Sequence, residues 1–149
     1  MKTDVAEIEL QKVVQDLKDN YYRLGLKASG KYEEALRYEV KKNGDVTELI
    51  VWGAPHGYYM EHGRGATTSA GSGVPLIEII KEWIRVKGLT LNPYAVTKKI
   101  HNEGIRVPNK FNKGKVISDV INNDRIKEIK DKVSSGIIEK AYSNVLNKL

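Results

Sequence analysis

The sequence predicts an α+β fold with an N-terminal helix, a small antiparallel sheet with a β-hairpin, short helices and a long C-terminal helix. Apolar residues recur at three- and four-residue steps near both ends of the chain, which is typical of amphipathic helices. Between them, two neighbouring segments with β character flank an Asn-Gly pair, which indicates a hairpin. With 149 residues, 40% hydrophobic and 30% charged, the chain is expected to form a single domain over 1–149.

An amphipathic helix is expected from Thr3 to about Leu24. Its apolar positions carry charged residues between them and are Leu10, Val13, Val14, Leu17, Tyr21 and Leu24. Thr3 or Asp4 can accept hydrogen bonds from the first free backbone N–H groups. Gly25 can take the left-handed conformation that ends the helix.

The period changes to two between Ala35 and Lys42, which predicts a strand with one buried face. Asn43-Gly44 suits a two-residue type I′ turn, and Val46–Trp52 forms the second strand. This register predicts the cross-strand pairs Leu36–Val51, Tyr38–Leu49, Val40–Thr47 and Glu39–Glu48. The last pair sets two like charges against each other.

The segment Gly63–Gly73 has four glycines and no large apolar side chain. It offers too little surface for burial to offset the entropy of ordering its backbone. We therefore expect a mobile loop over 63–73, disordered in the isolated subunit and ordered by a neighbouring one.

Two short helices follow this loop. Pro75 is expected to open the first, which ends at Lys87-Gly88. Asn92-Pro93 supplies the cap and first turn of the second, which ends at Gly104.

A long helix is predicted from about Asn123 to Leu149, within a basic segment over 115–149. It carries two apolar stripes, one formed by Ile126, Ile129, Val133 and Ile137 and the other by Ile138, Tyr142, Val145 and Leu149. The stripes lie roughly 150° apart at 100° per residue, so one core cannot cover both. Either the helix bends at Ser134-Ser135-Gly136, or the second stripe is an interface with another subunit.

The net charge of +6 is unevenly distributed, because residues 98–149 hold 12 basic against 6 acidic residues. Lys127, Lys130 and Lys140 lie outside the first stripe and are candidate anion-facing residues. Such a diffuse positive face attracts phosphate without choosing bases, or pairs with an acidic protein surface.

No pattern in the sequence supports an enzyme, a metal or a cofactor. The chain has no cysteine, and His56, His62 and His101 lack a metal-binding spacing. The glycine loop lacks the Gly-Lys-Ser/Thr ending of a phosphate-binding loop, and its serines lie in no nucleophile-elbow pattern. No apolar run reaches the length of a membrane span, and no membrane partner is expected.

A series of motifs within residues 36–106 resembles the head–tail connector and tail-completion family of tailed phages (HK97 gp10-like). The motifs are Tyr58-Tyr59-Met60-Glu61-His62-Gly63-Arg64-Gly65, Pro75-Leu76-Ile77 leading into Ile80-Lys81-Glu82-Trp83-Ile84, Lys87-Gly88, Tyr94-Ala95-Val96, and Lys99-Ile100 before Glu103-Gly104-Ile105. The resemblance lies in their order and spacing.

The resemblance implies a non-enzymatic virion protein, assembled in the host cytoplasm, that forms a homo-oligomeric ring at the portal–tail junction. Portal or adaptor proteins and tail proteins are the implied partners, and DNA in the channel is a possible non-specific contact. The family's aromatic-x-Glu-x-Gly segment, which marks the turn out of the sheet, falls here on Tyr59, Glu61 and Gly63. His62 stands where the family has an aromatic residue.

The candidate family-motif and assembly residues are Tyr59, Glu61, His62, Gly63, Arg64, Pro75, Trp83, Gly88 and Gly104. For Trp83 we favour simple core packing. The rival interpretation is a non-specific nucleic-acid-binding module that uses the basic C-terminal third, although the sequence has neither a helix-turn-helix signature nor a basic stripe interleaved with aromatic residues.

Overall fold

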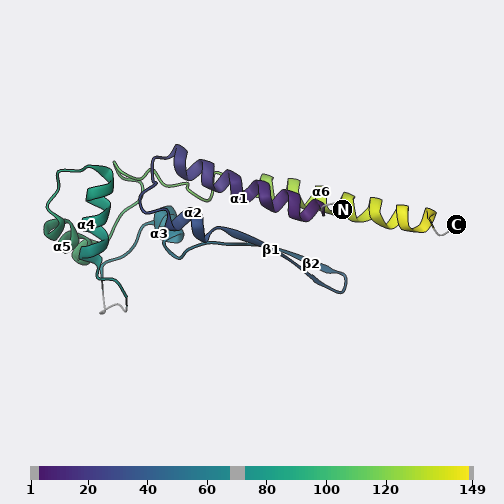
Figure 1. Ribbon diagram of the computed structural model, residues 1–149, viewed down its shortest axis with the longest axis horizontal. Helices are drawn as coiled ribbons and strands as arrows, with labels where there is room; N and C mark the ends of the chain where they lie inside the picture. The colour runs from purple at the N-terminus through teal and green to yellow at the C-terminus, as the bar shows by residue number, and fades with distance from the viewer. Residues whose placement is uncertain (1–3, 68–72, 148–149) are drawn as a thin grey trace.

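The computed structural model describes residues 4–67 and 73–147 and confirms the α+β class. In chain order the elements are α1 (Val5–Arg23), α2 (Lys31–Ala35), β1 (Arg37–Asn43), β2 (Val46–Trp52), α3 (His56–His62), α4 (Leu76–Lys87), α5 (Pro93–Glu103) and α6 (Asn123–Leu146). Figure 1 shows an elongated molecule in which α1, α6 and the hairpin run along the long axis, while α4 and α5 lie together at one end.

Helix α1 begins and ends where the sequence indicates. Asp4 is the N-cap, and its carboxylate accepts a hydrogen bond from the Ala6 N–H at 3.1 Å. At the other end the Leu24 N–H donates to the Asn20 carbonyl, and Gly25 follows with a positive φ of 68°. Thr3, the alternative cap, lies outside the described residues.

The hairpin forms, but its register differs from the expected one by two residues. The structure pairs Tyr38 with Val51, Val40 with Leu49 and Lys41 with Glu48. The turn is therefore Gly44-Asp45, and only the glycine has a positive φ, as a type II′ turn requires. A shift of two residues keeps each side chain on its predicted face and replaces the expected Glu39–Glu48 pair with an attractive Lys41–Glu48 pair.

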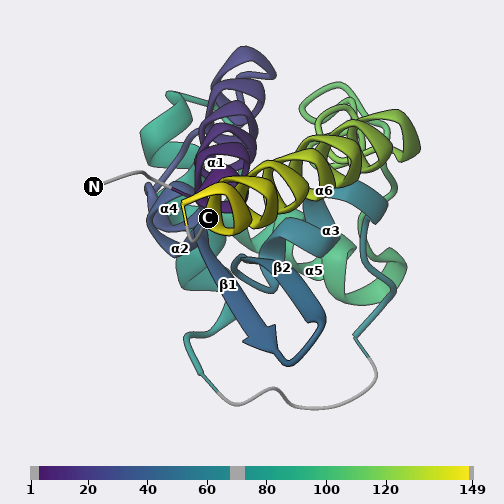
Figure 2. The same ribbon diagram turned by 90° about the vertical axis from the view of Figure 1, so that its right-hand side faces the viewer.

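The core lies on the inner faces of α1. On one side α1 covers the hairpin, and on the other it packs against α6, as the end-on view in Figure 2 shows. The central cluster of buried residues is Ala6, Val13, Val14, Leu17, Tyr21, Tyr32, Leu36, Val116, Ile129 and Val133. Segments from both ends of the chain therefore build one core around α1.

Two short helices, α2 and α3, were not expected from the sequence. Each depends on a tertiary contact: Tyr32 of α2 is buried with its ring centroid 4.5 Å from that of Tyr21. Gly57 of α3 is buried so close to Tyr32 that a Cβ there would lie 3.1 Å from its ring. Helices this short are unstable alone, and packing holds them in place.

The pair α4 and α5 has the expected caps. Pro75 immediately precedes α4, and Gly88 follows it in the left-handed conformation with φ 61°. The Asn92 side chain accepts hydrogen bonds from the Tyr94 and Ala95 N–H groups at the start of α5. Trp83 lies edge-on to Phe111 at 5.2 Å between ring centroids, so it packs within this end of the molecule and outside the central cluster.

Helix α6 is one continuous helix through Ser134-Ser135-Gly136. Of the first stripe only Ile129 and Val133 are buried, and Ile126 and Ile137 are exposed. Figure 1 shows α6 continuing past the N-terminal end of α1, which is why its last turns lack cover from the core. Within the described ranges, every helix is too short or too polar to cross a lipid bilayer.

Candidate functional site: the junction of α3 with residues 101–118

The residues of the Tyr59–Arg64 motif meet the end of α5 at a two-residue antiparallel bridge. The Arg64 N–H donates to the Ile105 carbonyl at 2.9 Å, and the Ile105 N–H donates to the Arg64 carbonyl at 2.8 Å. Gly63 and Gly104 precede these two residues and have φ values of 82° and 74°. The bridge thus joins two motif segments that are distant in the sequence.

Glycine is required on both sides of the bridge. A Cβ on Gly63 would meet the Ile105 carbonyl oxygen, and one on Gly104 would meet the Arg64 carbonyl oxygen. Both φ values also lie in the left-handed region that L side chains rarely adopt. Gly63 is therefore needed for two reasons: the positive φ of the turn, and the close approach of the Ile105 carbonyl.

Glu61 joins α3 to the segment that follows α5. Its Oε2 accepts a hydrogen bond from the Ile117 N–H at 2.8 Å. Burial raises the pKa of Glu61, but the hydrogen bonds from Ile117 and from Ser118 outweigh burial and leave the pKa below its ordinary value. Glu61 is therefore a structural anion that holds backbone.

A second contact reinforces this one. The Asn112 side chain donates from Nδ2 to the Met60 carbonyl at 2.8 Å. With the Glu61 bond, it ties both ends of residues 112–117 to one turn of α3. The expected acceptor role of the motif glutamate agrees with this geometry.

The first part of the glycine-rich segment is also held in place. The Thr67 N–H donates to the His101 carbonyl at 2.9 Å, and His101 Nδ1 lies 2.7 Å from Thr67 Oγ1. Arg64 Nη2 donates to the same hydroxyl at 3.0 Å. Residues 63–67 therefore have defined hydrogen bonds in this structure, and residues 68–72 lie outside the described residues. The mobility of the loop over 63–73 stays a prediction.

An open concavity of about 590 Å³ lies beside the bridge. Tyr58, Tyr59 and His62 of α3 line it together with the basic residues Arg64 and Arg106. The apolar residues of the lining are Ile105 and Val107. Among the described residues, no carboxylate lines the concavity. Tyr58 and Tyr59 are 63% and 52% exposed, so both are accessible to a ligand.

The charge surplus of the last third of the chain lies mainly in the segment that contains Arg106, and less in the part that forms α6. Residues 98–115 hold six basic residues against one acidic residue, whereas residues 116–149 hold six against five. The six are Lys98, Lys99, Arg106, Lys110, Lys113 and Lys115. A charge count in shorter windows could have found this cluster, but only the fold brings Tyr58 and Arg64 beside Arg106.

The remaining sequence-derived candidates lie elsewhere. Pro75, Trp83 and Gly88 belong to α4 and its ends. Lys127 and Lys130 are exposed on α6, but Lys140 is close enough to Asp4 for its charge to contribute to lowering the pKa of that carboxyl, after the hydrogen bonds from Lys42 and Ala6. All three lysines are exposed, and their role as anion-facing residues stays a prediction.

The second apolar stripe of α6 is uncovered. Ile138, Tyr142 and Val145 are 60%, 71% and 61% exposed, and Leu149 lies outside the described residues. At 100° per residue these side chains point to the side of α6 opposite Ile129 and Val133. The stripe therefore does not belong to the core of the monomer.

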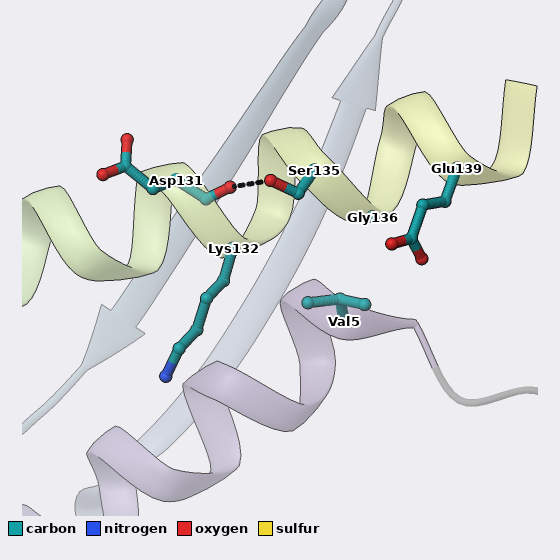
Figure 3. Close-up of a pocket in the computed structure, with 6 residues that line it drawn as sticks. All are labelled: Val5, Asp131, Lys132, Ser135, Gly136 and Glu139. Atoms are coloured by element: carbon teal, nitrogen blue, oxygen red, sulfur yellow. Dashed lines mark hydrogen bonds between the residues drawn. The ribbon is translucent and has the colours of Figure 1, made fainter.

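A shallower concavity of about 360 Å³ lies where the first turn of α1 crosses α6. Figure 3 shows Val5 facing Gly136, with Lys132 directed toward α1 and Asp131 away from it. A Cβ on Gly136 would lie 2.8 Å from the Val5 side chain. Gly136 is therefore the point of close approach between the two helices and not a bend.

No family model, curated protein or solved structure matches the chain.

Proposed function

We propose that the chain is a structural virion protein of a tailed phage that assembles as a ring at the head–tail junction, after synthesis in the host cytoplasm. Portal or adaptor proteins and tail proteins would be its partners. The proposal begins with the motif resemblance over residues 36–106. It is supported by the way in which the motif residues Glu61, Gly63 and Gly104 hold backbone segments together, since such roles suit an assembly scaffold.

The observation that carries the proposal is the uncovered stripe at the end of α6. Residues 137–147 are amphipathic, with Ile138, Tyr142 and Val145 on one side and polar residues toward the α1 side. An exposed apolar face of this kind is typical of a protein–protein contact. Its position beyond the end of α1 leaves it accessible to another molecule.

A second uncovered apolar face lies at the other end of the molecule. Ile79 and Val86 of α4 are 51% and 39% exposed. They lie on the same side of that helix because they are seven residues, or nearly two turns, apart. If the α6 stripe of one copy contacts the α4 face of the next, the same contact can repeat from copy to copy. The copies form a closed ring when the rotation between neighbours divides a full turn. Two distinct faces at opposite ends support ring assembly over a simple twofold dimer.

Size-exclusion chromatography with light scattering, followed by electron microscopy, tests the proposal. We expect the purified chain to form closed rings in a concentration-dependent way. A chain that stays monomeric at all concentrations, and that also fails to bind purified portal or tail-tube components, would contradict the proposal. If such a monomer bound nucleic acid tightly, the rival function, a nucleic-acid-binding module, would replace it.

A further inference from the structure

We infer that the concavity between α3 and residues 105–107 binds a nucleic-acid strand, with its arginines on the phosphates and its tyrosine rings on the bases. The inference goes beyond ring assembly and does not depend on it. It assigns the nucleic-acid contact to a different surface from the α6 lysines. Charge, aromatic exposure and rigidity support it.

The charge around the concavity has no internal partner. None of the basic residues of 98–115, nor Arg64, forms an ion pair with a carboxylate in the part of the chain that the structure describes. Many basic residues elsewhere, such as Lys42, Arg85 and Lys132, do form such pairs. Arg64 and Arg106, the two basic residues that line the concavity, therefore carry charge that no carboxylate neutralises within the described residues, and such charge can attract a polyanion.

The aromatic side chains in the same place have exposed rings. Tyr58 contacts His62 at 4.6 Å and Tyr59 at 6.0 Å between ring centroids, so the three rings form one cluster. Exposed rings beside arginines are the usual platform for unpaired bases, which stack on them regardless of sequence. The structure thus supplies the interleaving of aromatic and basic residues that the linear sequence does not show.

The backbone beneath these groups is fixed. Arg64 lies in the bridge to Ile105, and its guanidinium is oriented by Thr67. Arg106 follows Ile105 directly, so the same bridge places both arginines. Because the two backbone positions are preset, binding of a ligand costs little backbone entropy at these residues.

The extent of the charge favours nucleic acid over an acidic peptide. A single carboxylate would need only Arg64 and Arg106. Lys110, Lys113 and Lys115 follow Arg106 along the chain and are exposed, which suits a ligand with repeated negative charge, such as a phosphodiester backbone.

Fluorescence anisotropy with a labelled oligo-dT of about 20 nucleotides, and with a duplex of the same length, tests the inference. The first variant is Arg64→Gln/Arg106→Gln. The matched control is Lys127→Gln/Lys130→Gln, which removes the same charge from exposed positions of α6. Both variants should fold, because neither change alters the backbone of the bridge. Thermal melts check this.

We expect the arginine variant to weaken oligo-dT binding about 10-fold or more at ~50 mM salt. The slope of log K against log salt should fall by about 1.4, since each phosphate contact contributes about 0.7 for a single strand. The control should change affinity by less than about 3-fold. Tyr58→Leu/Tyr59→Leu should weaken single-strand binding at least ~5-fold with an unchanged salt slope, and the duplex should bind more weakly than the single strand.

Equal losses in the arginine variant and the control would overturn the inference, because binding would then be diffuse. Absence of binding by the wild-type chain would also overturn it. Displacement of the oligonucleotide by poly-glutamate at equal charge concentration would replace it with recognition of an acidic protein. Light scattering on the same samples reports assembly separately, so a failure here is distinguishable from a failure of the ring proposal.

Discussion

Gly63 and Gly104 lie on either side of one backbone bridge, and each faces a carbonyl of the opposite segment. A side chain on either glycine would displace the strand that holds Arg64 or Ile105. The junction of α3 with the end of α5 therefore rests on the absence of two Cβ atoms.

Gly63→Ala and Gly104→Ala should each lower the free energy of unfolding by more than about 3 kcal/mol. Each combines the positive-φ penalty of about 1–2 kcal/mol with a backbone clash. Gly25→Ala is the matched control, because its φ is also positive at 68° but nothing lies within 4 Å of a Cβ there. This control should lose only the positive-φ penalty in the free energy of unfolding, which urea denaturation measures. Equal losses at all three positions would show that the close approach is unimportant.

Glu61 should make stability pH-dependent in the acid range. Its pKa is lower in the folded than in the unfolded chain, so the unfolded chain binds the proton more readily as the pH falls. Its contribution to stability is complete above the unfolded pKa of about 4.5 and is lost as the pH falls through the folded pKa. Glu61→Gln should be less stable at pH 7, and its stability should fall less steeply than that of the wild type below about pH 5. Parallel profiles of the two proteins would contradict this role.

Gly136 should behave unlike an ordinary helical glycine. Gly→Ala in a helix interior normally stabilises by about 1 kcal/mol, but here the new methyl group would press on Val5. Gly136→Ala alone should therefore give no gain or a loss. In the background of Val5→Ala, which removes the obstructing methyl groups, the same change should stabilise. A double-mutant cycle by thermal or urea unfolding measures the coupling, and additivity would refute the contact.

The exposed stripe of α6 should matter for assembly and not for folding. Tyr142→Ser/Val145→Ser should abolish self-association and leave the melting temperature of the dilute monomer nearly unchanged, since both side chains are more than half exposed. The control Val133→Ala, at a buried position of the same helix, should lower stability by about 1–3 kcal/mol. A large loss of monomer stability in the serine variant would place the stripe in the core.

Mixing two assembly-deficient variants identifies the geometry of the contact. If the α6 stripe meets the α4 face of the next copy, Tyr142→Ser/Val145→Ser and Ile79→Ser/Val86→Ser should each be monomeric alone. Mixed together, they retain one intact face each and should form a one-to-one dimer without rings. Light scattering distinguishes this result from a twofold contact, in which the α4 variant would still associate and mixing would add nothing.

Local chemistry allowed much of the fold to be predicted. Asp4, Asn92 and Gly88 cap helices through contacts with their immediate neighbours, so the bounds of α1, α4 and α5 follow from the sequence to within a few residues. The hairpin follows from its alternation, but its register does not. A type I′ turn needs a positive φ at both central residues and a type II′ turn only at the first, so Gly44 can serve in either turn. The choice of Gly44-Asp45 as the turn shifts all pairs by two.

The candidate site could be predicted only in part. The sequence alone determined that Glu61 and Gly63 lie two residues apart in one segment, that the last helix carries a second apolar stripe and that the charge surplus lies in the last third. Tertiary structure decided what these features do, because it brought Gly104 and Arg106 against the end of α3 and the residues that follow it. It also placed α6 so that its last turns extend past α1, which leaves Tyr142 uncovered. Caps and periodicity depend on neighbours within a few residues. A bridge, a concavity or an uncovered face depends on which distant segments share a core, and no local pattern encodes that.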